Sequence, residues 1–388
     1  METNLLILTI VLTISFALSL LFRRYKYPDV IAQICAGLLL GIPILKNIFF
    51  SANNVVQVFS EIGIIFLLLL TGMEVNYKKL LNEKKEIIIV AVFSFIIPFT
   101  LGYICMILLG YSKTVAIIVG FALSLTAEGT KLKLLLDYNL IRTKIGEIII
   151  GAGIADDFFE IIGLSFVLFN IIGTTVHWFK FPIEIIGFSI IMFILLKYLP
   201  RLLENIKRTT NEIEDFTLVI ILGLMTAFIA QILDLGTIIG AFMGGIVVHK
   251  LFNTEEEEKT MLKDLKMITF GFIVPFFFVN IGLQFNYDKL FTDNLLFIVI
   301  LGVAIIGKLI GSIIVSFFSD ITLKQSMLIG WAMNSRGAVE LIIVGIAKAN
   351  NIIPDTIFNA IVLMTIITTM LFPLILKRTL KNNPDIMN

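Results

Sequence analysis

Cysteine and histidine are scarce in this chain of 388 residues, which has two of each. Cys35 and Cys105 both fall inside apolar stretches, so we expect neither to form a disulfide. His177 and His249 each stand alone in the sequence, which argues against a histidine-based metal centre. No phosphate-binding loop and no paired nucleophile and base are recognisable. The sequence therefore supports neither an enzymatic activity nor a resident cofactor.

Charged residues are also scarce: they make up 15% of the chain, against 58% hydrophobic residues, and the mean hydropathy is +1.00. This balance is too apolar for a soluble domain and is typical of a polytopic membrane protein. The longest polar connectors, near 201–215 and 253–266, leave no room for a large aqueous domain. Lys and Arg are scattered and the net charge is only +1, so nucleic acid is not an expected partner.

Apolar stretches long enough to cross a lipid bilayer recur along the whole chain. A spanning helix needs about 20 apolar residues at about 1.5 Å of rise per residue. By this measure we predict an all-α polytopic membrane protein with about 13 transmembrane helices. Their approximate limits are 4–22, 28–46, 55–75, 86–110, 114–136, 145–172, 181–200, 214–232, 235–251, 266–285, 294–318, 324–348 and 354–376.

The placement of Lys and Arg predicts how the chain crosses the membrane. With the amino terminus outside, the inside loops hold 21 of the 30 basic residues and the outside loops hold 5. The positive-inside rule then favours an external amino terminus and a cytoplasmic carboxyl terminus. The basic residues near the first apolar stretch follow it, so this stretch is not a signal peptide. Because no targeting extension is recognisable, we expect a multi-pass protein of a prokaryotic cell membrane.

Several charged residues fall inside the apolar stretches. Asp156 and Asp157 lie in the middle of the segment 148–172, and Lys308 lies midway along the segment 295–318. Each such charge costs about 2.5–3.5 kcal/mol on insertion scales, so adjacent acids indicate a buried polar site. A lysine at that depth needs a partner, and Asp156 is the expected one. This pattern favours a transporter that exchanges ions.

A short segment occurs twice, 210 residues apart. The nine residues from Gly72 to Leu80 and from Gly282 to Leu290 share five identical positions. This aligns the third predicted span with the tenth, and because seven is odd, the two halves would cross the membrane in opposite directions. The sequence therefore predicts an inverted-topology repeat, with chance similarity between apolar segments as the alternative.

The same offset relates polar interruptions in the fifth and twelfth predicted spans. Each mixes glycine with hydroxyl or charged residues that a lipid-facing helix does not tolerate. We therefore predict two broken helices that cross, with packing of two continuous helices as the alternative. Glu128 and Glu340 would compensate the positive helix ends, and Arg336 or Lys131 the negative ones.

Four of these features together resemble a known family. They are Ala-Asp-Asp ending at Asp157, Ser-Leu-Thr-Ala beginning at Ser124, Gly307-Lys308, and Asn-Ser-Arg-Gly-Ala-Val-Glu-Leu beginning at Asn334. In order and spacing they resemble the sodium/proton antiporters of the cation:proton antiporter-2 family, within the monovalent cation:proton antiporter superfamily. The resemblance extends over essentially the whole chain.

The resemblance implies a homodimer in the lipid bilayer, built from a scaffold and a moving core. The implied divisions are 1–85 (scaffold, helices 1–3), 86–176 (core, helices 4–6), 177–213 (linker, helix 7), 214–292 (scaffold, helices 8–10) and 293–388 (core, helices 11–13). It also implies that two acids facing a lysine exchange two protons for one cation, which is electrogenic Na⁺ (or Li⁺)/H⁺ antiport.

An alkali cation prefers hard oxygen ligands. We expect Asp157 to bind the cation and a proton in turn, with Thr126 adding its hydroxyl or carbonyl oxygen. The small partners would then be H⁺ and Na⁺, with Li⁺ or K⁺ as alternative cations, and we expect no cofactor besides the transported ions. In the alternative, the pair of Asp156 and Lys308 is purely structural and one proton is exchanged through Asp157.

Other polar residues are candidates for the ion pathway, namely Glu74, Ser124, Glu160 and Asn334. Glu160 follows Asp156 by four residues and so shares its helix face. Glu74 has a second interpretation, as a solvated helix end. Glu128 departs from the family pattern, in which small or hydroxyl residues are usual, and it would be either a further ligand or a helix-end charge.

Two other functions remain open. The first is K⁺/H⁺ exchange by the same fold, alone or as the membrane pore of a regulated K⁺ efflux system. The second is a channel or membrane-bound sensor without coupled exchange, in which Asp156, Asp157 and Lys308 would be structural charges.

Overall fold

The structure is a computed structural model. It describes residues 2–49, 55–74, 85–156, 159, nine positions between 187 and 198, 212–233, 237–252, 254–289 and 292–387. Over these residues all regular structure is helical, which confirms the all-α prediction. The predicted seventh span and the second half of the sixth lie mostly outside the described residues.

Seven helical stretches among the described residues are long and apolar enough to cross a membrane. They are α1 (Glu2–Arg24), α4 (Val55–Glu74), α6 (Lys85–Leu108), Ile213–Ile232 of α11 (Glu212–Ile232), Glu256–Leu283, Asn294–Phe317 and α18 (Asp355–Asn382). The bent pair α16 (Leu323–Met333) and α17 (Ala338–Ala349) makes an eighth. The chain is therefore a multi-pass membrane protein, whereas the figure of 13 spans stays a prediction.

Shorter helices occupy several of the remaining predicted spans. Three of them are apolar, namely α2 (Asp29–Leu40), α7 (Lys113–Ser124) and α12 (Thr237–His249). The other elements are α3 (Pro43–Phe49), α8 (Glu128–Asp137), α13 (Glu255–Ile268), η1 (Thr269–Ile273), α14 (Val274–Leu283), η2 (Tyr287–Lys289), α15 (Asn294–Ile313), η3 (Ile314–Phe317) and η4 (Pro384–Met387). Residues 144–156 are also helical.

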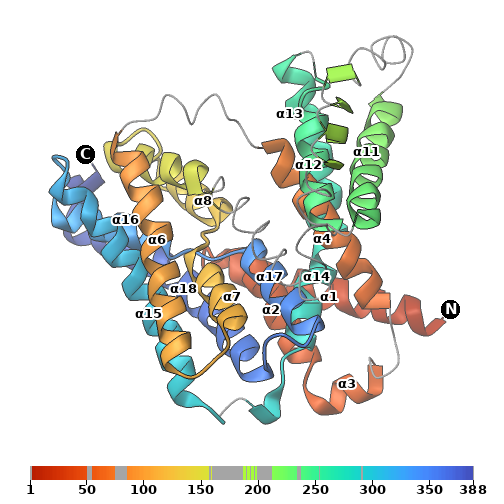
Figure 1. The fold of residues 1–388 in the computed structure, drawn as a ribbon, viewed down its shortest axis with the longest axis horizontal. Helices are drawn as coiled ribbons and strands as arrows, with labels where there is room; N and C mark the ends of the chain where they lie inside the picture. Colours follow the sequence, from red (N-terminus) through yellow and green to blue (C-terminus); the bar gives the residue numbers. More distant parts are fainter. Residues whose placement is uncertain are drawn as a thin grey trace. The chain divides into compact units, whose positions relative to one another are not determined.

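The chain forms two compact units. The first comprises Met1–Ile14, Ile48–Val75 and Leu168–Asn280, and the second comprises Ser15–Asn47, Asn76–Val167 and Ile281–Asn388. In the first unit α12 packs against both α4 and α11 (Figure 1). Leu69, Leu222 and Val248 contribute to the apolar core between these helices, where each is at most 3% exposed.

Helices α4 and α12 approach closely because each has a glycine at the contact. A Cβ atom on Gly72 would lie 2.1 Å from the backbone oxygen of Phe242, and one on Gly245 would lie 2.2 Å from that of Leu69. A backbone neighbour cannot rotate away as a flexible side chain can, so a methyl group at either position forces the helices apart.

We therefore expect Gly72→Ala to lower the free energy of unfolding by about 1–3 kcal/mol through overpacking. The measurement is a sodium dodecyl sulfate titration of detergent-solubilised protein followed by circular dichroism. Gly302→Ala in α15 is the matched control, because a Cβ atom there meets nothing within 4 Å. Equal unfolding curves for the two variants would contradict the close helix contact.

The second unit contains the charged residues that the sequence places inside apolar spans. In it α6 packs against α7 and α15, and α15 also packs against α16 and α18 (Figure 1). Its apolar core joins Val90 of α6, Ile149 of the helical residues 144–156, Ile329 of α16 and Phe372 of α18, all fully buried. Helices α6, α16 and α18 all pack against α15, which contains the buried Lys308.

Candidate ion-binding site

Two helices of the second unit are interrupted, and the interruptions touch. Helix α7 ends at Ser124, the backbone is extended at Leu125 and Ala127, and α8 begins at Glu128. The axis bends by 48° between α16 and α17. The backbone N–H of Ala127 donates a hydrogen bond of 2.8 Å to the carbonyl of Ser335, between the two breaks. Both spans are thus broken where the polar interruptions in the sequence predict.

Arg336 lies in the second break and reaches the end of α7. Its Nη1 atom donates to the carbonyl oxygens of Ala122 (2.9 Å) and Leu125 (2.8 Å). The last carbonyls of a helix have no partner within the helix and carry partial negative charge, so a buried guanidinium both satisfies and compensates them. The Arg336 side chain is fully buried, which makes these two bonds important for the break.

The end of α16 and the start of α17 also have charged side chains beside them. Lys131 of α8 is buried, and its Nζ lies 3.7 Å from the Sδ of Met333, the last residue of α16. Glu340 lies in the first turn of α17, where a negative charge favours the helix dipole. One of its carboxylate oxygens lies 3.8 Å from Nη1 of Arg336.

Lys308 projects from α15 to the break after α7. Its ammonium donates to the carbonyl oxygen of Ser124 and, at 2.6 Å, to the hydroxyl of Thr126. The same nitrogen lies 3.7 Å from Oδ2 of Asp156, which is the partner that the sequence suggests. Lys308 is 0% exposed and Asp156 is 2% exposed. A carbonyl, a hydroxyl and a carboxylate therefore surround the buried ammonium group of Lys308.

Asp156 retains capacity to accept further hydrogen bonds. Its Oδ1 atom is buried and makes no hydrogen bond to the residues that the structure describes. Carboxylate, hydroxyl and freed backbone carbonyl oxygens thus gather where two helices are broken, and these are the ligand types that bind alkali cations. Broken helices with such groups at their ends are the ion sites of many secondary transporters.

The family described as "Sodium/hydrogen exchanger, transmembrane" matches residues 9–382. The chain belongs to this family. A Na⁺/H⁺ antiporter of Enterococcus hirae is 31% identical over 378 residues, which cover 96% of either chain. The Na⁺/H⁺-K⁺ antiporter GerN of Bacillus cereus is 28% identical over 360 residues, covering 92% of this chain and 91% of GerN.

A solved structure supports the fold assignment. The sodium proton antiporter MjNhaP1 from Methanocaldococcus jannaschii, solved at pH 8, matches with a TM-score of 0.69. The match covers 98% of this chain and 97% of that one, at 16% sequence identity. The exchanger described here therefore shares the fold of that antiporter.

Two further residues predicted for the site of the exchanger, Ser124 and Asn334, lie at the ends of α7 and α16. Ser124 donates its hydroxyl to the carbonyl of Phe121 and offers its own carbonyl to Lys308. Asn334 caps α16, with its side-chain amide 3.2 Å from the carbonyl of Gly330. Both side chains are fully buried, and each bonds to a backbone carbonyl in the last turn before a break.

Four predicted residues are placed less completely or away from the breaks. Asp157 and Glu160 lie outside the described residues, and Glu128 is placed only as the first residue of α8. Glu74 ends α4 in the first unit, where its half-exposed carboxylate pairs with Lys266 at 2.5 Å. For Glu74 the structure shows a solvated ion pair at a helix end.

Sequence reasoning missed the contribution of α18. Thr365 donates to Oε1 of Glu340 at 2.7 Å, and the hydroxyl of Thr369 accepts from the backbone N–H of Arg336 at 2.9 Å. The signal was available as three threonines, at 365, 368 and 369, within an otherwise apolar span. Hydroxyls in a spanning helix often bond to their own helix, so their spacing alone did not identify a partner.

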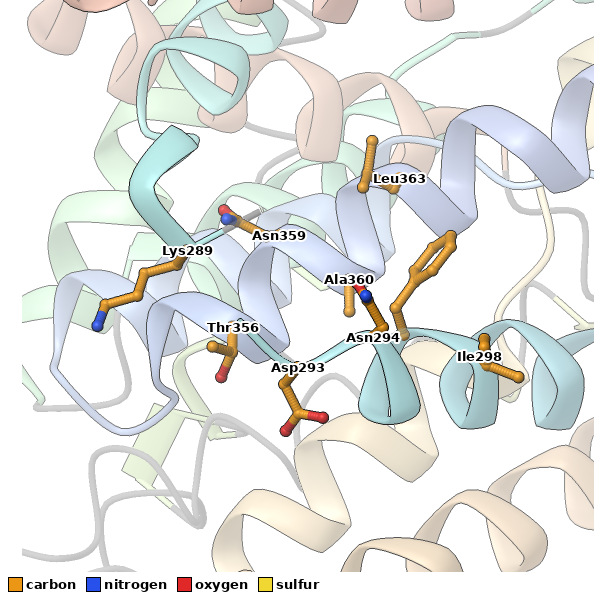
Figure 2. Close-up of a pocket in the computed structure, with 9 residues that line it drawn as sticks. Lys289, Asp293, Asn294, Ile298, Thr356, Asn359, Ala360 and Leu363 are labelled. Carbon is orange, nitrogen blue, oxygen red and sulfur yellow. The ribbon is translucent and has the colours of Figure 1, made fainter. Parts of the chain in front are cut away.

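A separate cavity of about 390 Å³ lies at the amino-terminal ends of α15 and α18 (Figure 2). Its lining residues are Lys289, Asp293, Asn294, Phe297, Ile298, Thr356, Asn359, Ala360 and Leu363. Asn359 is already engaged there, because it bonds both the N–H and the carbonyl of Asn286. None of the predicted ion-site residues that the structure describes lines this cavity.

Proposed function

We propose that the chain exchanges Na⁺ or Li⁺ for H⁺ across a cell membrane by alternating access. The observation that carries this proposal is the buried contact of Lys308 with Asp156, Thr126 and the carbonyl of Ser124, where two broken helices meet. Membership of the sodium/hydrogen exchanger family and the Na⁺/H⁺ antiporter of Enterococcus hirae support it.

The mechanism follows from competition at the carboxylates. Asp157 binds the cation when ionised and releases it when protonated, and Thr126 supplies a hydroxyl oxygen to the same cation. Lys308 now donates to Thr126 and lies beside Asp156, so its ammonium and the incoming cation compete for the same oxygens. Two acids facing one lysine favour electrogenic exchange of two protons for one cation, which is the pattern of the cation:proton antiporter-2 branch.

Alternating access requires one part of the chain to move against another. We propose 13 spans in an inverted-topology repeat, with the amino terminus outside and the carboxyl terminus in the cytoplasm. Residues 86–176 and 293–388 form the moving core, residues 1–85 and 214–292 form the scaffold of a homodimer, and residues 177–213 link them. Two breaks 210 residues apart that touch through Ala127 and Ser335 support the repeat.

Potassium is the second candidate cation. GerN, which is similar over most of both chains, is named a Na⁺/H⁺-K⁺ antiporter. Carboxylate, hydroxyl and carbonyl oxygens bind all alkali cations, and the choice among them depends on cavity size and stiffness. K⁺/H⁺ exchange, with or without a regulatory subunit, therefore uses the same residues.

Proteoliposomes with an imposed pH gradient test the proposal. We expect Na⁺ or Li⁺ to dissipate the pH gradient with the unaltered protein. Asp157→Asn should abolish the response, because a side-chain amide does not bind and release a proton near neutral pH. Asp320→Asn, at an exposed position, is the matched control and should behave like the unaltered protein. A luminal fluorescent pH probe gives the rate.

The same vesicles separate the alternatives. A response to K⁺ alone would replace the sodium proposal by the potassium one. No response to any cation from mildly acidic to alkaline pH would overturn exchange and favour a channel or sensor. If the rate of exchange does not change with an imposed membrane potential, the electrogenic stoichiometry is overturned. Asp156 and Lys308 would then be a structural ion pair.

A further inference from the structure

We propose that Thr369 of α18 is a positioning residue that sets the geometry of the ion site through the backbone of Arg336. This inference rests on the proposed exchange function and extends it to a helix that has none of the predicted ion-binding residues. The hydrogen bonds of the Thr369 hydroxyl go to Arg336 and not to Lys308 or Asp156, so we expect its effect on transport to pass through Arg336.

The contact between Thr369 and Arg336 has two parts. The Thr369 hydroxyl accepts a hydrogen bond of 2.9 Å from the backbone N–H of Arg336 and donates one of 3.3 Å to the carbonyl of the same residue. Arg336 lies between α16 and α17, where the helical hydrogen bonds are interrupted. One side chain thus satisfies both polar backbone groups of a buried residue that lies outside any helix.

The neighbouring threonines show that this contact is specific to Thr369. Thr368 is equally buried, but its hydroxyl donates to the carbonyl of Met364 on its own helix, at 2.8 Å. Among the described residues, the hydrogen bonds of the Thr369 hydroxyl go to Arg336. Thr365, one turn earlier, adds a second link to the same break by donating to Glu340.

A short chain of contacts connects Thr369 to the buried ion pair. Fixing the Arg336 backbone fixes where its guanidinium emerges, and that guanidinium holds the carbonyls of Ala122 and Leu125. The adjacent residues, Ser124 and Thr126, supply the two oxygens that contact Lys308.

Displacement of the Arg336 backbone would therefore move the oxygen ligands of the proposed cation. Removing a group that hydrogen-bonds to a metal ligand and orients it commonly lowers metal affinity or activity by about 10- to 100-fold. The expected consequence is weaker cation binding by correctly folded protein, because the carboxylates and the lysine all remain.

The experiment compares Thr369→Val, Thr369→Ser and Thr368→Val in proteoliposomes at a temperature where all variants remain folded by circular dichroism. Valine keeps the shape of threonine without its hydroxyl, and serine keeps the hydroxyl. We expect Thr369→Val to raise the KM for Na⁺ about 10- to 100-fold with a smaller change in maximal rate. Thr369→Ser should restore a KM close to that of the unaltered protein, and Thr368→Val should not change it.

The outcomes distinguish this inference from the proposed function. If the unaltered protein exchanges Na⁺ for H⁺ and Thr369→Val has the same KM as Thr368→Val, the positioning role is wrong and exchange stands. Equal losses of maximal rate in both valine variants would also overturn it, since they indicate a general packing effect. If the unaltered protein exchanges no cation, the proposed function itself fails.

Discussion

Lys308→Met is expected to lower the free energy of unfolding by about 3–5 kcal/mol, because it leaves a buried carboxylate without its counter-charge. Asp156 is 2% exposed, so in this conformation its carboxylate is compensated by the ammonium 3.7 Å from its Oδ2 atom and not by bulk water. The carbonyl of Ser124 and the hydroxyl of Thr126 lose their donor in the same variant. A sodium dodecyl sulfate titration of the purified protein, followed by circular dichroism, measures the loss.

The double variant Asp156→Asn, Lys308→Met separates charge from packing. Replacing both members of a buried pair by neutral residues is often close to neutral for stability, so most of the loss should be recovered. Lys377→Met, at an exposed position of α18, is the matched control and should change stability by no more than about 0.5 kcal/mol. A double variant as unstable as Lys308→Met alone would contradict the role of the ion pair.

Arg336→Gln is expected to destabilise the protein by a similar amount, about 3–5 kcal/mol, because it affects both broken helices. The carbonyls of Ala122 and Leu125 lose their donor at the end of α7, and each buried acceptor left unpaired costs about 1–3 kcal/mol. Glu340, 1% exposed, loses the positive charge 3.8 Å from its carboxylate. The same detergent titration gives the magnitude.

A second substitution divides the effect of Arg336 into its two parts. Arg336→Gln combined with Glu340→Gln removes the uncompensated carboxylate but leaves the two carbonyls unpaired, so only part of the stability should return. Arg378→Gln, at an exposed position of α18, is the control and should unfold like the original protein. Full recovery in the double variant would show that the contacts with Ala122 and Leu125 contribute nothing.

The sequence by itself determined the features that depend on local composition. A run of apolar residues must satisfy its backbone within a helix when it lies in lipid, so membrane spans such as α4, α6 and α18 could be located closely. Glycine and charged side chains inside such a run cannot face lipid, which located both breaks, at 125–127 and after Met333. Burial of Asp156 and Lys308 followed from the same cost of exposing charge to hydrocarbon.

Only the tertiary structure decided which of these polar groups meet. Helical periodicity tells which side chains share a face but not which other helix that face contacts, and the partners at this site are far apart in the chain. Arg336 holds carbonyls more than 200 residues away, and Lys308 divides its contacts among Ser124, Thr126 and Asp156. Backbone carbonyls are present at every residue, so nothing in the sequence marks the ones that a break exposes. The contact of α18 with the second break could not be predicted for the same reason, since the Thr369 hydroxyl reaches Arg336 only when the helices pack together.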